Sequence, residues 1–228
     1  MKNLKACLAE MFGTFALVFI SIGAIYHVNH QQMDLLGLAL AYGLATGVMV
    51  SATLAVSGGH LNPAVSFAAF LAGKMEFKQA ACYVGAQLAG AVLAGFICVK
   101  VFSSGVVSTA TPNLGKDVSI GTAIAVEAAL TFLVVFSMFG TVLDARGPKL
   151  GGLCVGLVVT TCVLFGQSLT GAAMNPARVF GPGLVSGHLA NHAVYWIGPM
   201  LGAALAGVIY GRFLIVPDEL PPAQQKKK

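Results

Sequence analysis

The chain has 228 residues, of which 57% are hydrophobic and only 9% are charged. Soluble domains carry about 25% charged residues, so composition excludes an ordinary soluble protein. The net charge of +5 comes from basic residues that are sorted by loop, and this distribution does not suggest a nucleic-acid partner. The composition therefore predicts an integral membrane protein.

Six stretches are apolar enough to cross a membrane, because a spanning helix needs roughly 20 mostly apolar residues. In chain order we expect helices at about 6–27, 35–56, 79–102, 119–143, 150–168 and 191–214. No small-residue cleavage site follows the first stretch, so we expect a retained helix and not a signal peptide. The predicted fold class is an all-α membrane protein.

Basic residues are unevenly divided between the expected loops. With the N-terminus inside, ten Lys and Arg residues lie on the cytoplasmic side, and only Lys100 and Lys116 lie outside. This bias predicts that both termini are cytoplasmic. We expect a disordered cytoplasmic tail at 215–228, with binding to anionic lipid as a weaker alternative. The short termini favour a bacterial inner membrane.

The chain also contains an internal repeat. Three strings recur in order: "AEMFGTFALVF" from 9 and "VEAALTFLVVF" from 126, "GGHLNPAVSF" from 58 and "GAAMNPARVF" from 171, "YVGAQLAGAVLAG" from 83 and "YWIGPMLGAALAG" from 195. Each half, 1–102 and 119–214, holds three expected helices, so the second half must enter from the opposite face. The halves are predicted to be inverted repeats, joined by a linker at 103–118 that is rich in turn formers.

The string Asn-Pro-Ala occurs twice, at Asn62, Pro63 and Ala64 and again at Asn175, Pro176 and Ala177. Asparagine is a strong N-cap and proline suits the first helical position, so we expect half-helices at about 63–72 and 176–185. Inversion would bring their N-termini together at the membrane centre, where non-helical backbone needs protein or a water-filled cavity around it. The alternative is that both strings are only capped helix starts in loops.

At this point the chain resembles the aquaporin, or major intrinsic protein, family over about 5–214. The resemblance rests on the paired Asn-Pro-Ala strings, the arginine after the second, a glutamate in the first helix of each half, and "GGHLNPAVS". It implies six transmembrane helices plus two re-entrant half-helices, a pore that passes water, and a homotetramer in membrane lipid with one pore per subunit.

The resemblance also implies an outer constriction of four positions, which motif matching places at Tyr42, Val163, Ala172 and Arg178. Arg178 would supply fixed donors and a permanent positive charge that repels protons and cations. Its alternative is an arginine that reaches to the membrane edge. The other three residues are alternatively ordinary packing residues.

The expected permeants follow from the positions at which this chain differs from other members of the family that it resembles. Strict water channels usually place histidine where this chain has Val163, and glycerol channels usually place aspartate where it has Val179. The chain most resembles the tonoplast-intrinsic and aquaporin-8-like branch. We therefore expect water plus small neutral solutes: glycerol, urea, ammonia, hydrogen peroxide or neutral metalloid acids.

Three further polar residues stand out in this apolar sequence. Glu10 and Glu127 are intramembrane carboxylates, which are costly. We expect each to accept bonds from backbone N–H groups of the re-entrant loop in its own half, with a proton relay as the alternative. His60 resembles the family's pore-lining histidine on the cytoplasmic side, either as a hydrogen-bonding wall or as a gate that responds to protonation.

Two other functions compete with a passive pore. A proton-coupled transporter of a small solute would use Glu10 and Glu127, although two positive helix ends at the centre oppose proton passage. An adhesion or junction protein would need larger outer loops. The sequence contains no Ser/His/Asp, metal-ligand or phosphate-loop constellation, so we expect no enzyme, metal or cofactor. The five cysteines are interpreted as buried thiols.

Overall fold

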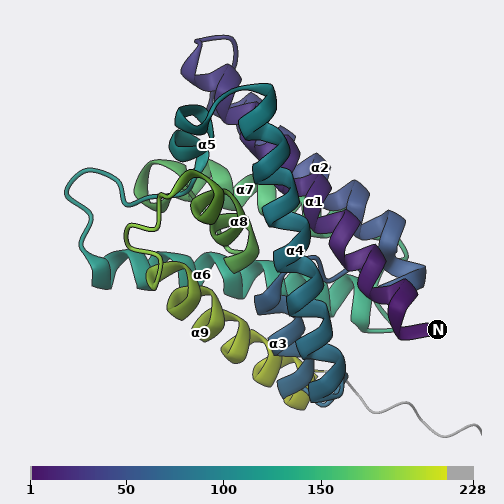
Figure 1. Ribbon diagram of the computed structural model, residues 1–228. Helices are drawn as coiled ribbons and strands as arrows, with labels where there is room; N and C mark the ends of the chain where they lie inside the picture. Colours follow the sequence, from purple (N-terminus) through teal and green to yellow (C-terminus); the bar gives the residue numbers. More distant parts are fainter. Residues whose placement is uncertain (1, 215–228) are drawn as a thin grey trace, which may run out of the picture.

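The structure is a computed structural model that describes residues 2–214, and its secondary structure there is entirely helical (Figure 1). The long helices are α1 (Lys2–Asn29), α2 (Leu35–Ser57), α4 (Phe77–Val101), α6 (Ile120–Met138), α7 (Leu153–Thr170) and α9 (Val194–Ile209). Short helices lie between them: α3 (Pro63–Leu71), α5 (Ser104–Ala110) and α8 (Pro176–Ser186). Two π-helical turns, Phe139–Leu143 and Tyr210–Leu214, extend α6 and α9.

In the part of the chain that the structure describes, six helices are long and apolar enough to span a membrane, and they confirm the predicted segments to within a few residues. Helices α3 and α8 begin at the two motif prolines. Helix α8 continues through Pro182, whose fixed φ suits a helix, and stops at Gly187 with φ 77°. The tail 215–228 lies outside the described residues.

The linker differs from the expectation of turns alone, because it contains helix α5. The Ser103 hydroxyl caps this helix by accepting a bond from the Val106 N–H at 3.2 Å. Val107 and Ala110 on α5 are buried, and α5 packs against α8. Sequence patterns miss so short a helix because its stability comes from packing and not from intrinsic propensity.

Glycines set how closely the long helices cross within each half. Helix α1 packs on α4 and helix α6 packs on α9. A methyl group added to Gly90 of α4 would lie 2.1 Å from the Met11 carbonyl oxygen, and one added to Gly202 of α9 would lie 2.0 Å from that of Ala128. Both crossings therefore require a residue without a side chain.

Each short half-helix packs against the last long helix of the other half. A methyl group at Gly95 of α4 would lie 3.2 Å from the Gly181 carbonyl oxygen of α8. One at Gly207 of α9 would lie 3.0 Å from the Ala68 carbonyl oxygen of α3. Helices α2 and α7 also pack directly on one another, so the two halves form one continuous core.

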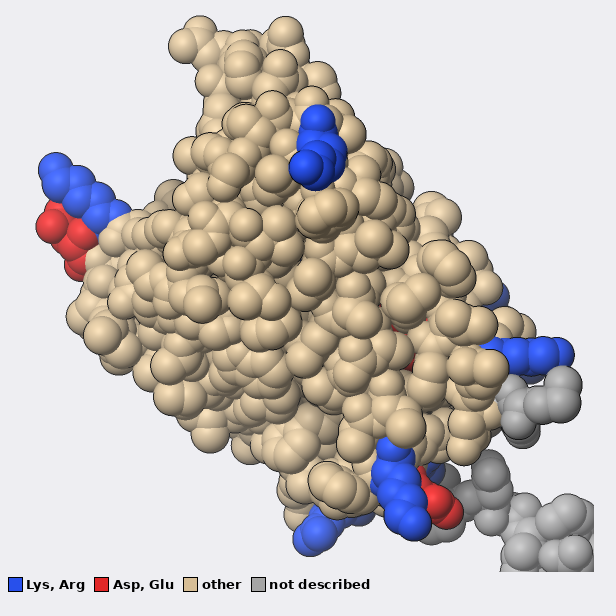
Figure 2. All heavy atoms as spheres, in the orientation of Figure 1, with Lys and Arg blue, Asp and Glu red and all other residues tan. Residues whose placement is uncertain are grey.

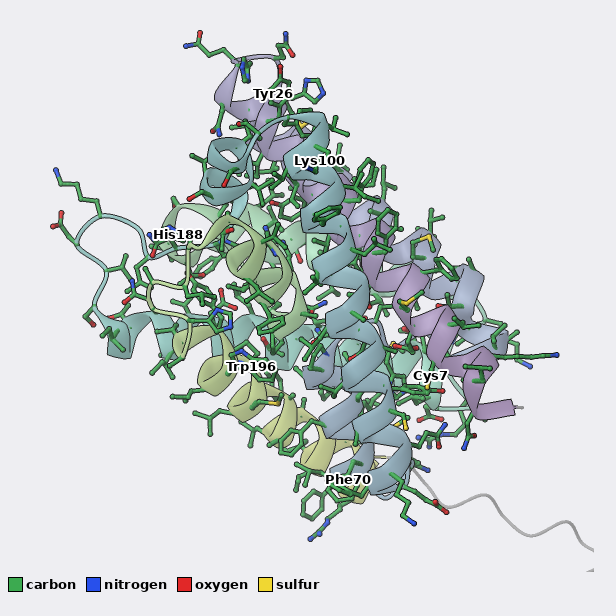
Figure 3. All side chains as sticks on the ribbon, viewed as in Figure 1. Cys7, Tyr26, Phe70, Lys100, His188 and Trp196 are labelled. Atoms are coloured by element: carbon green, nitrogen blue, oxygen red, sulfur yellow. The ribbon has the colours of Figure 1, made fainter. Side chains whose placement is uncertain are left out.

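Charged side chains gather at the two ends of the molecule, and the band between them is almost free of charge (Figure 2). Tyr26 and Lys100 lie towards one end and Phe70 lies at the other (Figure 3). This division matches the requirement that a lipid-facing band be apolar.

Arg146, in the loop after α6, forms an ion pair with Asp144 and a hydrogen bond to the end of the last helix. The Arg146 guanidinium donates to both carboxylate oxygens of Asp144, at 2.9 and 2.6 Å, and also to the Leu214 carbonyl oxygen at 2.8 Å. The guanidinium holds the pKa of the Asp144 carboxyl well below its usual range. The contact fixes the turn that leads from α6 to α7.

Candidate functional site

The two Asn-Pro-Ala strings meet tip to tip inside the molecule. The side-chain oxygen of Asn62 accepts from the Ala64 N–H at 2.8 Å, and that of Asn175 accepts from the Ala177 N–H at 3.0 Å. These are N-cap bonds. Each amide nitrogen then reaches across to the other half, Asn62 to the Met174 carbonyl at 2.8 Å and Asn175 to the Leu61 carbonyl at 2.9 Å.

The residue before each asparagine has an unusual backbone conformation. Leu61 has φ 51° and Met174 has φ 52°, in the left-handed region that side chains other than glycine disfavour. This conformation costs on the order of 1–3 kcal/mol per residue. It presents each carbonyl oxygen to the asparagine of the opposite half, so the cost is offset by the crossed bonds.

A narrow internal cavity of about 50 Å³ runs past this meeting point. A water molecule needs roughly 10–15 Å³ of such space, so the cavity has room for a few waters. Its walls come from both halves: Leu17, Ser21, Tyr42, Thr46, Val50, His60, Leu61, Asn62, Val65, Val134, Met138, Val155, Val159, Ala172, Ala173, Met174, Asn175 and Arg178.

Arg178 is buried against the cavity, with 6% of its surface exposed, and does not reach to a membrane edge. Its guanidinium donates to the Gly171 carbonyl oxygen at 3.2 Å and to the Tyr42 hydroxyl. The guanidinium carbon also lies 4.4 Å from the centre of the Tyr42 ring. The two residues therefore hold one another at the cavity wall, through a cation–π contact and a hydrogen bond.

The four positions matched to the outer constriction are not equally placed. Tyr42, Ala172 and Arg178 line the cavity, whereas Val163 is fully buried and does not. Val159, one turn earlier on α7, lines the cavity instead. The role of Val163 in the constriction stays a prediction.

Glu10 is fully buried and its carboxylate holds the first re-entrant loop. One oxygen accepts from the Ser57 hydroxyl at 2.6 Å and from the His60 N–H at 3.0 Å. The other accepts from the Leu61 N–H at 2.6 Å and from the Gln87 amide at 2.7 Å. Four donors thus satisfy a charge that would otherwise be costly to bury.

Glu127 holds the second loop in the same way. One oxygen accepts from the Thr170 hydroxyl at 2.6 Å and from the Ala173 N–H at 2.9 Å, and the other accepts from the Met174 N–H at 2.7 Å. Neither Glu10 nor Glu127 lines the cavity. Both carboxylates therefore face the loops that carry the asparagines, and not the space between them.

His60 lines the cavity, and its Nδ1 lies 3.1 Å from the Ser66 hydroxyl oxygen. The imidazole stands edge-on to the Tyr83 ring, with 5.4 Å between ring centres. Ser66 and Gln87, which contact this assembly from α3 and α4, were not singled out by the sequence. Each is a polar residue in an otherwise apolar stretch of the sequence, and this polarity was the signal that could have identified it.

The electrostatics of the cavity favour neutral molecules with lone pairs. The N-termini of α3 and α8 begin at the two asparagines, and each carries about half a positive elementary charge. Arg178 adds a full positive charge nearby. Each asparagine amide has one hydrogen committed to a carbonyl and a second that is available to the cavity.

Several lining residues lie beyond the motifs and were not predicted. Thr46 and Val50 follow Tyr42 at helical spacing on α2, and Ser21 and Met138 come from α1 and α6. The spacing of four residues between Tyr42, Thr46 and Val50 places them on one face of α2, and the sequence already contained this signal. Within residues 2–214, no group of three or more His, Cys, Asp or Glu side chains is placed to hold a metal ion.

Within residues 2–214, six helices that are long enough to span a membrane surround a cavity where two capped half-helices meet, and this arrangement defines a class of integral membrane protein with an internal cavity. The family model described as "Major intrinsic protein" matches residues 1–210, and the chain belongs to this family.

Individual proteins agree with this assignment. The chain is 42% identical over 217 residues to aquaporin TIP4-4 of Zea mays, covering 90% of this chain and 85% of the relative. It is 40% identical over 216 residues to the lens fiber major intrinsic protein of Oryctolagus cuniculus, covering 93% and 82%. The X-ray structure of the aquaglyceroporin from Plasmodium falciparum shares the fold, with a TM-score of 0.82, 24% identity and coverage of 92% and 96%. These relatives give no support to the expected bacterial inner membrane.

Proposed function

We propose that this chain forms a passive membrane channel for water and small neutral solutes. The observation that carries the proposal is the cavity in which two asparagine amides, two helix N-termini and Arg178 all present hydrogen-bond donors. Water and small alcohols or amides offer lone pairs to such donors. Most of the other lining residues are apolar, so a permeant forms few bonds at a time and can leave again.

Exclusion of protons and ions follows from the same groups in this proposal. A cation in the cavity would meet the Arg178 charge and two positive helix ends. A chain of waters would accept bonds from the asparagines at its centre and point its own hydrogens away on both sides. That arrangement opposes the transfer of a proton from one water to the next.

The selective constriction is proposed to consist of Arg178, Tyr42, Ala172 and Val163, of which the first three line the cavity. Ala172 contributes only a methyl group, so this part of the wall leaves room for permeants larger than water. Glycerol, urea, ammonia, hydrogen peroxide and neutral metalloid acids are the proposed range. The name of the maize relative, an aquaporin, supports water as the common permeant.

The proton-coupled transporter has less support than the channel. Glu10 and Glu127 would need access to the cavity in order to exchange protons with a permeant. Both carboxylates are fully buried and hold backbone N–H groups of the loops. Each is proposed to be structural.

The arrangement in the membrane is also a proposal. We place both termini on the cytoplasmic side, because the positive-inside bias of the loops supports it. The halves 1–102 and 119–214 are taken as inverted repeats, and the matched pairs Gly90 with Gly202 and Glu10 with Glu127 support this. A homotetramer with one pore per subunit is proposed from family membership.

A solute re-swelling assay in proteoliposomes tests the selective role of Arg178. After shrinkage in glycerol or urea, the wild-type vesicles should re-swell as solute enters. Arg178→Ala should re-swell faster and should also pass small cations, because a fixed charge and a bulky side chain are gone. Arg212→Ala, which removes an exposed arginine from the end of the last helix, is the matched control and should behave like wild type. Unchanged selectivity in folded Arg178→Ala would refute this constriction.

A further inference from the structure

We propose that Gln87 and Ser66 are positioning residues, which keep His60 neutral with its proton on Nε2, the ring nitrogen that Ser66 does not contact. The inference rests on the proposed function, because it concerns how one wall of the proposed pore is polarised. Neither Gln87 nor Ser66 lines the cavity, so both would act through His60.

A buried chain of hydrogen bonds runs from Glu10 through Gln87 and Ser66 to His60. The Gln87 amide nitrogen lies 2.7 Å from a Glu10 carboxylate oxygen and 3.0 Å from the Ser66 hydroxyl oxygen. That hydroxyl oxygen lies 3.1 Å from His60 Nδ1. Glu10, Gln87 and Ser66 are fully buried, so solvent does not compete for these bonds.

The direction of each bond follows from the carboxylate. A carboxylate only accepts, so the Gln87 amide must turn its nitrogen towards Glu10. The reverse orientation would place two acceptor oxygens against one another. With the nitrogen there, its two hydrogens go to Glu10 and to the Ser66 oxygen. Ser66 therefore accepts from Gln87 and keeps its own hydroxyl hydrogen to donate.

Ser66 then determines which nitrogen of His60 carries the proton. Among the described residues, His60 Nδ1 is the acceptor that lies within reach of the Ser66 hydroxyl hydrogen. If Nδ1 carried a proton, this buried hydroxyl would have no acceptor, at a cost of about 1–3 kcal/mol. Nδ1 must therefore accept, and the proton of the neutral ring is on Nε2. A doubly protonated ring is disfavoured for the same reason.

Two titratable side chains face the imidazole from the helices packed around it. Glu10 of α1 would favour a charged ring, but it already accepts four hydrogen bonds. Tyr83 of α4 presents its ring, and its hydroxyl donates to the Ser57 carbonyl oxygen at 2.9 Å. Neither group offers Nδ1–H an acceptor in place of Ser66.

Comparison of the halves shows that this chain of bonds is not needed to hold a re-entrant loop. The repeat places Ala173, Val179 and Pro199 opposite His60, Ser66 and Gln87. The second loop is nevertheless held on Glu127 by the same two backbone N–H groups and a hydroxyl. The additional polar groups of the first half therefore serve the cavity.

A fixed tautomer has a consequence for permeation. His60 lines the cavity, and with its proton on Nε2 it joins the asparagine amides and Arg178 as a donor to lone pairs on the permeant. A histidine that exchanged its proton between Nδ1 and Nε2 would be able to relay protons. Gln87 and Ser66 would prevent that exchange.

Solid-state NMR on the full-length protein, labelled with ¹⁵N in its histidine rings and placed in lipid bilayers, tests the proposal. The His60 signals are identified by their loss in His60→Gln. At neutral pH we expect protonated Nε2 and unprotonated Nδ1, with no change down to about pH 5.5. Ser66→Ala should give a mixture of both tautomers and a ring that titrates. Ser21→Ala is the control, because Ser21 lines the cavity but bonds the Val18 carbonyl of its own helix at 2.9 Å.

A wild-type His60 that carries its proton on Nδ1, or that populates both tautomers, would overturn the proposal. So would a Ser66→Ala spectrum that matches wild type. If Ser66→Ala does not fold, the wild-type spectrum alone decides the proposal, because a proton on Nδ1 of His60 contradicts it without any variant. The spectrum does not depend on conduction, so a protein that passes no water refutes the proposed channel and leaves this assignment to be decided by the NMR result.

Discussion

At the scale of single residues, two buried carboxylates account for the shape of the cavity's centre. Each re-entrant loop contains a backbone conformation that costs free energy at Leu61 or Met174. Glu10 and Glu127 offset this cost by accepting the N–H of these same residues, at 2.6 and 2.7 Å. The asparagine that follows each of them is thereby fixed before any permeant arrives.

Glu10→Gln is expected to lower the free energy of unfolding by about 3 kcal/mol, because the new amide turns donors towards donors in a buried site. Unfolding in mixed detergent micelles measures this change. Glu76→Gln, at an exposed position that makes no side-chain cap bond, is the control and should be neutral. A well-folded, fully stable Glu10→Gln protein that loses a pH-driven flux would instead favour the transporter.

At the scale of helices, close crossings place the half-helices at the centre. Helix α4 approaches α1 at Gly90 and α8 at Gly95, so two glycines of one helix position two partners. Helix α9 repeats the arrangement at Gly202 and Gly207. Membrane helices gain little from the hydrophobic effect against one another, so their association depends on such close packing.

Gly90→Ala is therefore expected to destabilise the protein by about 1–3 kcal/mol, because the added methyl overlaps the Met11 carbonyl oxygen and forces α1 away from α4. Gly85→Ala, on the same helix, is a matched control, since a methyl group there meets nothing within 4 Å. It should be neutral or slightly stabilising, because alanine is the better helix former. Equal effects of the two substitutions in an unfolding assay would contradict this account of the crossing.

At the scale of the whole molecule, the sequence predicted most of the fold. Hydrophobic length placed the six spanning helices, and asparagine with proline located the starts of α3 and α8. Helix α5 and the π-helical turns were missed, because packing and not pattern determines them. Of the four positions proposed for the constriction, Tyr42, Ala172 and Arg178 line the cavity and Val163 does not. Counting from a motif fixes a position along a helix, whereas the level of a cavity depends on how neighbouring helices pack.

The polar chain behind His60 was also beyond sequence reasoning. Gln87 and Ser66 come from different helices, and only the packing of α3 on α4 brings them to Glu10. The repeat did contain one indication. These positions are polar in the first half and apolar in the second, where Val179 and Pro199 occupy them.

The most direct test of the channel is the rate at which proteoliposomes shrink after sudden exposure to an impermeant sugar, measured by stopped-flow light scattering. A donor-lined cavity open to water predicts shrinkage several-fold faster than that of empty vesicles of the same lipid. Circular dichroism on the same sample verifies that the protein is folded. Shrinkage of folded wild-type vesicles at the rate of empty vesicles would contradict the proposed channel.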